Sequence, residues 1–135
     1  MVVKVETEEK RAVRLARAEE HRHYDFTMIW ARRYAEMKAR VEGRSTNHSC
    51  SQGKELLSRE DFSIWCKTNP HFIMFVVIYL DWVRSDFNLM LAPSIDRVDP
   101  DLGYTSDNMQ WLTFIENCEK NHKDPMDYLG GYWGC

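Results

Sequence analysis

The sequence has 135 residues and 44% hydrophobic content, enough for the packed core of one ordinary domain. Its formal net charge of −3 combines an excess of Lys and Arg over residues 1–44 (11 against 8 acidic residues) with an excess of Asp and Glu over residues 45–135 (13 against 7 basic residues). This balance excludes a protein that is basic throughout, as a dedicated nucleic-acid coat would be.

Residues 6–42 predict helix, because Glu and Arg dominate the stretch and no Pro or Gly precedes Gly43. We expect a break near His21–Asp25. After the break, apolar residues recur every three or four positions and mark one helix face: Phe26, Ile29, Trp30, Tyr34 and Met37. The basic residues are expected on or near the opposite side, as a solvated face or a phosphate-contacting one: Arg32, Arg33, Lys38, Arg40 and Arg44.

Residues 43–53 are rich in Ser, Asn and Gly, a composition typical of a loop. Ser58 is the predicted N-cap of a helix whose first turn is acidic. Phe62 and Trp65 are expected to face inward from that helix. Pro70 ends it and is suited to the first position of the next helix.

The segment 72–83 is apolar on nearly every side when drawn as a helix, which predicts a core helix. A buried strand is the alternative because of the Val and Ile content, but the run exceeds ordinary strand length. Its longest uninterrupted apolar run, 72–80, is too short to span a bilayer, so we expect no membrane partner.

No signal-peptide pattern opens the sequence, and no CxxC pair occurs in it. We therefore expect a cytoplasmic protein whose thiols are reduced. The thiols are those of Cys50, Cys66, Cys118 and Cys135.

The stretch 93–123 predicts a strand, a turn, a second strand and a helix. The strands are expected over 94–99 and 108–112, with the turn around 99–104. Strand, turn, strand and helix together are the smallest unit that can hold side chains of a strand beside side chains of the following helix.

Thr113 and Glu116 have the spacing of a capping box, so the helix should begin there. The unit would then hold the Asp96 carboxylate close to the Asn117 amide. One carboxylate and one amide oxygen suffice for Mg²⁺, which keeps much of its water. Such a cation neutralises a phosphate and assists the leaving oxygen in phosphodiester hydrolysis.

Three further polar side chains fit the same purpose. Asn108, at the entry to the second strand, would bond the loop backbone and fix the turn. Lys120 and Lys123 follow on the helix and would meet phosphates.

One set of residues stands in a fixed order within 93–123: Asp96-Arg97-Val98-Asp99, Gly103-Tyr104, Asn108, Trp111, Asn117 and Lys120. With these residues the stretch resembles the HNH, or ββα-metal, endonucleases, and most closely their small phage-type and intron-homing branch. A weaker resemblance extends upstream to a few further residues: Tyr34, Met37, Asp61, Phe62 and Trp65. Residues 1–25 and 124–135 lie outside it.

The resemblance implies a role for each matched residue. Asp96 corresponds to the metal-binding acid, and Asn117 to the last motif position, the second metal ligand. Asn108 corresponds to the asparagine that stiffens the loop between the strands. The site would nick or cut DNA with Mg²⁺ or Mn²⁺.

The residue after the metal-binding acid departs from the usual family pattern. That position is normally the histidine that activates water, whereas Arg97, common in this branch, stays protonated and accepts no proton. Arg97 would instead clamp the phosphate or stabilise the transition state. Asp99, a metal-bound hydroxide or His122 remain as candidates for the base.

A structural zinc site is not expected. Many HNH proteins hold zinc with two CxxC pairs, and the second pair would fall at Thr113 and Glu116. A different set of ligands is the alternative, with contributions from the helix and a distant loop: Cys118, His122, His48 and Cys50.

Together these features predict an α+β fold, with a mainly helical N-terminal part packed on a small ββα unit. We expect a helical extension over 1–44 and an HNH-like domain with supporting helices over 45–135. The leading function is a metal-dependent DNA endonuclease or nickase acting on duplex DNA. The alternative is a non-catalytic DNA-binding or partner-binding modulator, in the host cytoplasm if phage-encoded.

A protein partner would be met through the N-terminal helices or through the aromatic C-terminal tail. The tail carries three aromatic residues, Tyr128, Tyr132 and Trp133. Its three glycines, Gly130, Gly131 and Gly134, predict flexibility.

Overall fold

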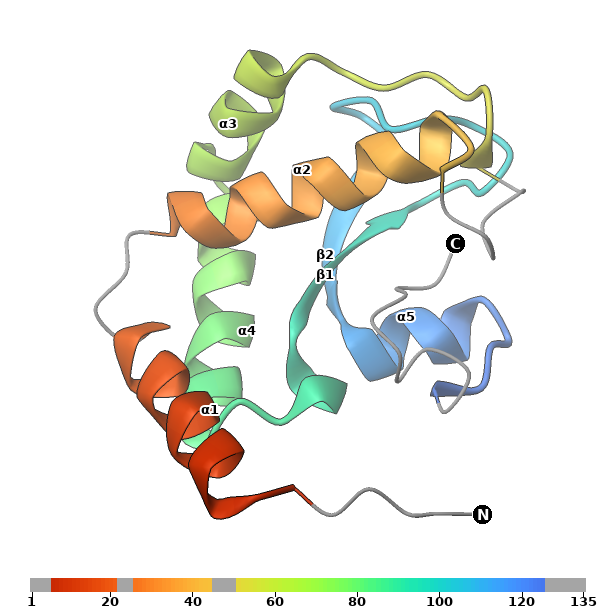
Figure 1. Cartoon of the computed structure of the whole chain (residues 1–135). Helices are drawn as coiled ribbons and strands as arrows, with labels where there is room; N and C mark the ends of the chain where they lie inside the picture. The colour runs from red at the N-terminus through yellow and green to blue at the C-terminus, as the bar shows by residue number, and fades with distance from the viewer. Residues whose placement is uncertain (1–5, 22–25, 45–50, 126–135) are drawn as a thin grey trace.

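A computed structural model of the chain describes residues 6–21, 26–44 and 51–125. The elements follow in the order α1 (Glu8–His21), α2 (Thr27–Val41), α3 (Arg59–Lys67), α4 (His71–Arg84), η2 (Leu89–Leu91), β1 (Pro93–Arg97), β2 (Met109–Thr113) and α5 (Phe114–Lys120). The fold is therefore α+β, as predicted (Figure 1). Two helices stand where the sequence predicts a broken helix, and the break itself, 22–25, lies outside the described residues.

The two strands form an antiparallel hairpin that lies between α4 and α5 (Figure 1). Its register pairs Ile95 with Trp111 and Asp96 with Gln110. Because side chains alternate between the faces of a strand, Ile95 and Trp111 point to one face, and Asp96 and Gln110 to the other. The first face joins the main core and the second faces α5.

The main core joins α2, α3, α4 and the hairpin in one cluster. Ile29, Trp30, Tyr34 and Met37 are buried, so the apolar face predicted for α2 is present. The described side chains of α1, residues 8–17, are exposed. Helix α2 is thus part of the same core as the hairpin, whereas α1 contributes no described side chain to it.

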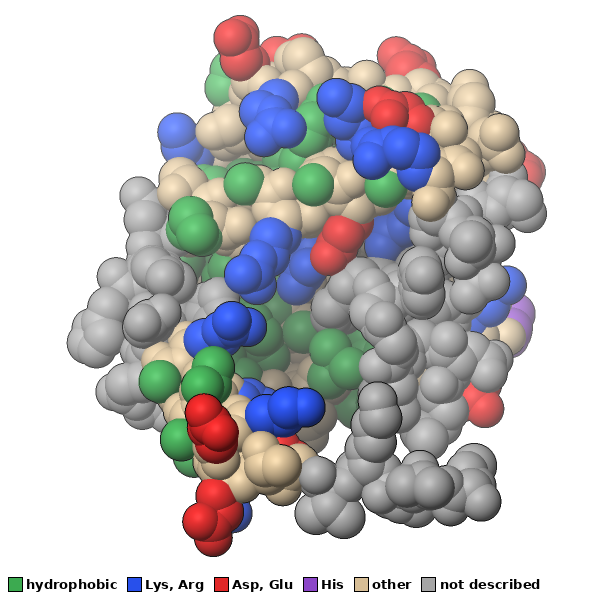
Figure 2. All heavy atoms as spheres, in the orientation of Figure 1, with side chains coloured by type: hydrophobic (Ala, Val, Ile, Leu, Met, Phe, Trp, Pro, Cys, Tyr) green, Lys and Arg blue, Asp and Glu red, His purple; other side chains and the backbone are tan. Residues whose placement is uncertain are grey.

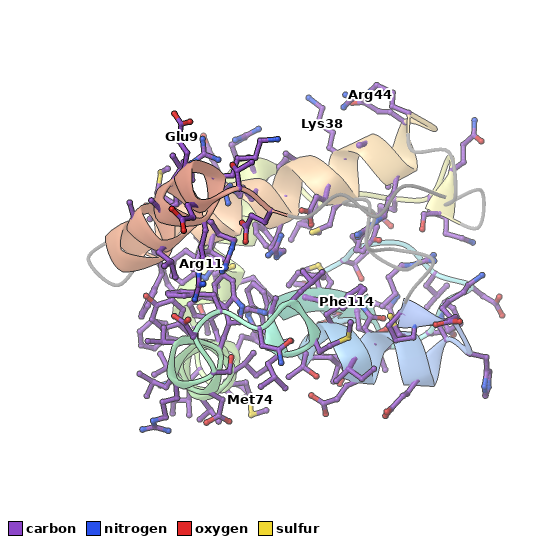
Figure 3. All side chains as sticks on the ribbon, turned by 60° about the horizontal axis from the view of Figure 1, so that its bottom comes forward. Glu9, Arg11, Lys38, Arg44, Met74 and Phe114 are labelled. Atoms are coloured by element: carbon purple, nitrogen blue, oxygen red, sulfur yellow. The ribbon has the colours of Figure 1, made fainter. Side chains whose placement is uncertain are left out.

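The basic face predicted for α2 is only partly correct. Arg32, Lys38 and Arg44 are exposed, and Figure 3 shows Lys38 and Arg44 pointing away from the helix. Arg33 and Arg40 are buried. They lie inward because their guanidinium groups have acceptors inside the fold.

Arg33 donates to the Pro93 carbonyl oxygen over 2.7 Å and pairs with Glu36 over 2.8 Å. Burial lowers the pKa of its guanidinium, and Glu36 partly offsets this effect. Arg40 donates to the Tyr104 hydroxyl over 3.4 Å. These two arginines tie α2 to the ββα unit and are not available to a phosphate.

Helix α4 is the helix predicted over 72–83, but it is buried on one side only. Phe75, Ile78 and Tyr79 are buried. The opposite side is apolar and exposed, with four residues between 42% and 55% exposed: Ile73, Met74, Val77 and Leu80. Figure 3 shows Met74 pointing away from the body of the protein. The expectation of a core helix buried all round is therefore wrong.

Local signals place the helix starts correctly. Ser58 accepts a hydrogen bond from the Asp61 backbone and caps α3. Thr113 and Glu116 form the predicted capping box of α5, with bonds of 3.2 and 3.0 Å. Pro70 lies one position before the first residue of α4.

The loop between the strands packs on the segment before α3. Leu56 forms a parallel bridge with Tyr104, and the two Tyr104 backbone groups bond Glu55 and Leu57. A β-carbon at Gly103 would collide with the Glu55 backbone, so the close approach requires glycine. No described helix is long and apolar enough to cross a membrane.

Candidate functional site

The α5-facing side of the hairpin carries a buried carboxylate. Asp96 Oδ2 accepts from Gln110 Nε2 over 2.8 Å and from Lys120 Nζ over 2.6 Å. The Asp96 side chain is 1% exposed and the Lys120 side chain 33%. A buried carboxylate needs a partner of opposite charge or strong donors, and here it has both.

The Lys120 ammonium is surrounded by oxygen atoms from one end of β1. Besides Asp96 Oδ2, it bonds the carbonyl oxygens of Arg97 over 2.7 Å and Val98 over 3.1 Å. An ammonium has three donors, so these three acceptors use all of them. Three oxygens of Asp96–Val98 therefore converge on a single positive charge.

Asn117 joins α5 to the same strand. Its Nδ2 donates to Ser94 Oγ over 2.7 Å and to the Ile95 carbonyl over 3.3 Å. Its Oδ1 accepts from Asn121 Nδ2 over 2.7 Å, one turn further along the chain. The side chain is buried, and both ends of its amide are bonded within the protein.

Asn108 bonds the loop backbone in the way the sequence predicts. Its Oδ1 accepts from the Asp99 backbone N–H over 2.8 Å. Its Nδ2 donates to the carbonyls of Asp99 over 3.0 Å and Gly103 over 2.8 Å. The side chain thus spans the inside of the loop and holds its two arms together.

Arg97 lies inside the same loop. Its guanidinium donates to the carbonyl oxygens of Pro100 over 2.8 Å and Leu102 over 3.1 Å, and stands 5.5 Å from the centre of the Tyr104 ring. The residue is only 3% exposed. A phosphate would reach this guanidinium only if the loop opened, so the predicted contact with nucleic acid stays a prediction.

The other predicted site residues are exposed and lie apart from the carboxylate. Asp99, His122 and Lys123 are all exposed, and Asp99 Oδ1 accepts from the Asp101 backbone over 3.0 Å. None of the three is a hydrogen-bond partner of Asp96 within 6–21, 26–44 and 51–125. The structure therefore brings Asp96, Lys120 and Asn117 to one face of the hairpin, and leaves the candidate bases outside that group.

The oxygen atoms at the end of β1 suit a cation. Carboxylate and carbonyl oxygens are the ligands of Mg²⁺ and Ca²⁺, and the Lys120 ammonium stands among them as a positive charge. The Asn117 amide oxygen, predicted as the second metal ligand beside Asp96, accepts a hydrogen bond from Asn121 Nδ2, so the metal pair Asp96 and Asn117 stays a prediction. In the part of the chain that the structure describes, no three His, Cys, Asp or Glu side chains gather as a metal cluster.

Two of the four alternative zinc ligands, Cys118 and His122, lie within the described residues. Cys118 is fully buried, and burial followed by the charges of Asp124 and Glu119 raises the pKa of its thiol. A raised pKa disfavours the thiolate that zinc binds. His48 and Cys50 lie outside the described residues.

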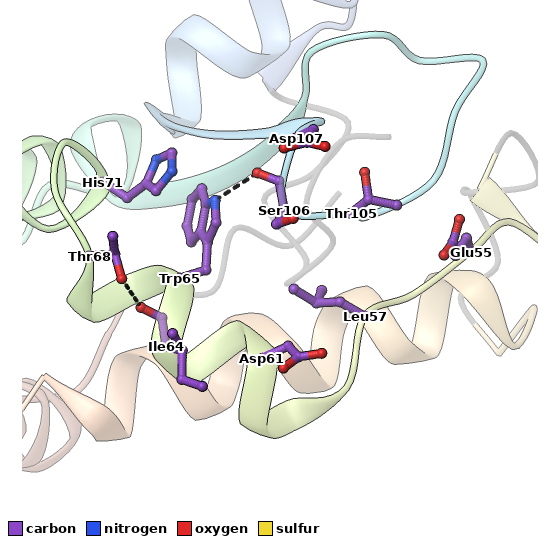
Figure 4. Close-up of a pocket in the computed structure, with 10 residues that line it drawn as sticks. All are labelled: Glu55, Leu57, Asp61, Ile64, Trp65, Thr68, His71, Thr105, Ser106 and Asp107. Carbon is purple, nitrogen blue, oxygen red and sulfur yellow. Dashed lines mark hydrogen bonds between the residues drawn. The ribbon is translucent and has the colours of Figure 1, made fainter.

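A pocket of about 660 Å³ lies elsewhere, between α3 and the loop that precedes β2 (Figure 4). The His71 ring stacks on Trp65 at 4.1 Å, and Trp65 Nε1 donates to the Ser106 carbonyl over 3.2 Å. Three acidic side chains in its lining, Glu55, Asp61 and Asp107, are exposed. No site residue predicted from the sequence lines this pocket.

Sequence reasoning missed three polar partners: Ser94, Gln110 and Asn121. Gln110 could have been predicted as a partner of Asp96, because the antiparallel pairing of the two strands places it opposite Asp96. Asn121 follows Asn117 at the four-residue spacing of helix neighbours.

Comparisons with known proteins leave the resemblance untested. No family model, no curated protein and no solved structure matches this chain.

Proposed function

We propose that the ββα unit is a metal-dependent phosphodiesterase site and that the protein nicks or cuts duplex DNA. The supporting observation is the convergence of three oxygens of Asp96–Val98 on one positive charge beside a buried carboxylate. Two of the three acceptors, Asp96 and Arg97, belong to a strand that is paired with its neighbour, and the third, Val98, follows that strand directly.

When bound, a divalent cation would supply charge neutralisation at the phosphate and a water of lowered pKa. Asp96 would fix the position of the cation, because Gln110 on the neighbouring strand holds the Asp96 carboxylate in place. Asn108 and Arg97 keep the loop beside it closed by bonding its backbone carbonyls. Asp99 and His122 are exposed and remain the candidate side chains for accepting a proton.

Duplex DNA is the proposed substrate, and the cytoplasm the proposed compartment. Lys123 just after α5, Arg32 and Lys38 of α2, and Arg44 just after α2 are exposed and would meet its phosphates. Figure 2 shows Lys and Arg side chains spread over α1 and α2, with Asp and Glu between them. This mixture of charges favours weak, salt-sensitive DNA binding over tight non-specific binding.

One observation favours a second function, a non-catalytic binding protein built on the same fold. The Lys120–Asp96 pair satisfies the carboxylate without a metal, and Arg97 leaves the position next to Asp96 without a base. Such a protein would bind DNA or a protein partner, and hydrolysis would play no part in its action.

Supercoiled plasmid with Mg²⁺ or Mn²⁺ distinguishes the two functions. We expect nicking or linear product with the natural protein, and a loss of at least about 100-fold with Asp96→Asn, which keeps the shape but removes the charge. Asp101→Asn, an exposed carboxylate in the same loop, is the matched control and should cut at the natural rate. Arg97→His, which places a base at the position, is included as a fourth protein.

The outcome against hydrolysis is equally clear. If none of the four proteins changes the plasmid with either ion, while gel-shift experiments show binding, the protein is the non-catalytic binder. If Asp96→Asn cuts as well as the natural protein, the nuclease that is present does not use this site.

A further inference from the structure

The Lys120 side chain has two unequal parts. Its ammonium is fixed by Asp96 Oδ2 and the carbonyl oxygens of Arg97 and Val98, while the side chain as a whole is 33% exposed. Lys120 lies in the last turn of α5. A side chain with a fixed head and a stem at the surface has a route out into solvent that requires no movement of the backbone.

The Asp96 carboxylate has no such freedom. It is 1% exposed, and its two partners in the described chain are Lys120 and the neutral Gln110. Removing a charged partner from a buried carboxylate leaves an uncompensated charge, which costs far more than the loss of one surface ion pair. Something positive must therefore stand at this end of β1 whenever the carboxylate is ionised.

We propose that Lys120 is a tethered cation that exchanges with a divalent metal ion at the Asp96–Val98 oxygens. This inference rests on the proposed function, because it describes how that same site is regulated. The ammonium and a metal ion cannot both take Asp96 Oδ2 and the two carbonyls. The site therefore has two states, with Lys120 inside or outside.

The exchange has two consequences for the proposed reaction. With Lys120 inside, the unit is held together without a metal, so the fold does not depend on the ion. With Lys120 outside, its ammonium is released beside the site, at the surface that a phosphate would approach. A metal ion must displace Lys120 to bind, so its apparent affinity is the intrinsic affinity multiplied by the fraction of metal-free molecules that have Lys120 outside.

Metal rescue of Lys120→Met tests the exchange without any nuclease assay. We measure thermal unfolding of the purified full chain and bound Mn²⁺ by electron paramagnetic resonance. Lys120→Met should unfold about 5 °C or more below the natural protein, because Asp96 loses its counter-charge. Saturating Mn²⁺ should recover most of that loss, and Mn²⁺ should bind at least about tenfold more tightly than to the natural protein.

Three further variants make the result specific. Lys123→Met removes an exposed lysine from the segment just after α5 and should change neither quantity. Asp96→Asn combined with Lys120→Met should show no Mn²⁺ rescue, because the carboxylate is gone. Lys120→Gln, which keeps a polar head without the charge, serves if the methionine variant does not fold.

The inference is overturned if Mn²⁺ stabilises the natural protein and both Lys120 variants equally, or stabilises neither variant. Its failure is separable from that of the proposed function. Rescue without plasmid cutting leaves the exchange standing and removes the nuclease. Cutting by the natural protein without rescue of the variants leaves the nuclease standing and removes the exchange.

Discussion

The two faces of the ββα hairpin are held by different forces, although the same ten residues make both. On the α4 side, Ile95, Met109 and Trp111 enter the main core and pack against aromatic rings, with Trp111 4.8 Å from Phe75 between ring centres. On the α5 side, Ser94 and Asp96 are equally buried, but each bonds a named donor. One face depends on area removed from water, the other on directed partners.

The difference indicates where the hairpin can change and where it cannot. An apolar face tolerates substitutions that keep its volume, because packing has many solutions. A buried polar face does not, because each donor or acceptor left alone costs about 1–3 kcal/mol. A fold that needed only stability could use apolar side chains on both faces, so the polar face is where we place the function.

The largest expected effect comes from the apolar face. Trp111→Ala removes a buried ring from the centre of the core, and we expect a loss of about 3–5 kcal/mol in the free energy of unfolding, measured with urea. Leu112→Ala is the matched control, because Leu112 is the next residue of β2 and is only partly buried on the other face. Equal losses for the two variants would contradict the division between the faces.

A smaller loss is expected from the polar face, where no large group is removed. Asn117→Ala deletes the donor to Ser94 Oγ and the Ile95 carbonyl, and we expect a loss of about 2 kcal/mol in urea unfolding. Asn121→Ala, which removes a less buried partner of Asn117 itself, should cost about half as much. If Asn117→Ala is as stable as the natural protein, the bonds drawn from α5 to β1 do not hold the face together.

The features that the sequence predicted well are local ones. The capping box depends on two residues three positions apart, and the α4 helix on an apolar run longer than a strand. Each signal is complete within a few turns of chain, so no knowledge of the rest of the fold is needed. The order of strand, turn, strand and helix followed from the same kind of signal.

The features that the sequence did not reveal depend on what lies opposite. The sequence of an apolar helix does not indicate which of its faces packs against the rest of the protein. For this reason the exposure of Ile73 and Val77 on α4 was not predicted. Arg33 was expected on a solvated or phosphate-contacting face and Lys120 at a phosphate, but carbonyl oxygens from β1 lie within reach of both. A long basic side chain bonds the nearest fixed oxygen, and its identity is known only after the elements are packed.

The smallest expected effect lies at the margin of the apolar face, where His71 stacks on Trp65 and Trp65 lies 6.0 Å from Trp111 between ring centres. Burial lowers the pKa of the His71 imidazole. Above its unfolded value of about 6.5 the ring is neutral in both states and has no effect on stability. As the pH falls below that value, the unfolded chain binds the proton first, so stability is lost down to the lower folded pKa.

His71→Phe keeps an aromatic ring against Trp65 and removes the proton-binding group. We therefore expect the natural protein to lose more stability than this variant between about pH 7 and pH 5 in urea unfolding, because only the natural protein has the His71 imidazole. The two proteins differ only at this position, so the difference between the two curves isolates the histidine. If the stability of His71→Phe falls with pH in parallel with that of the natural protein, packing against Trp65 does not lower the pKa of His71, and the stacked ring is solvated in the fold.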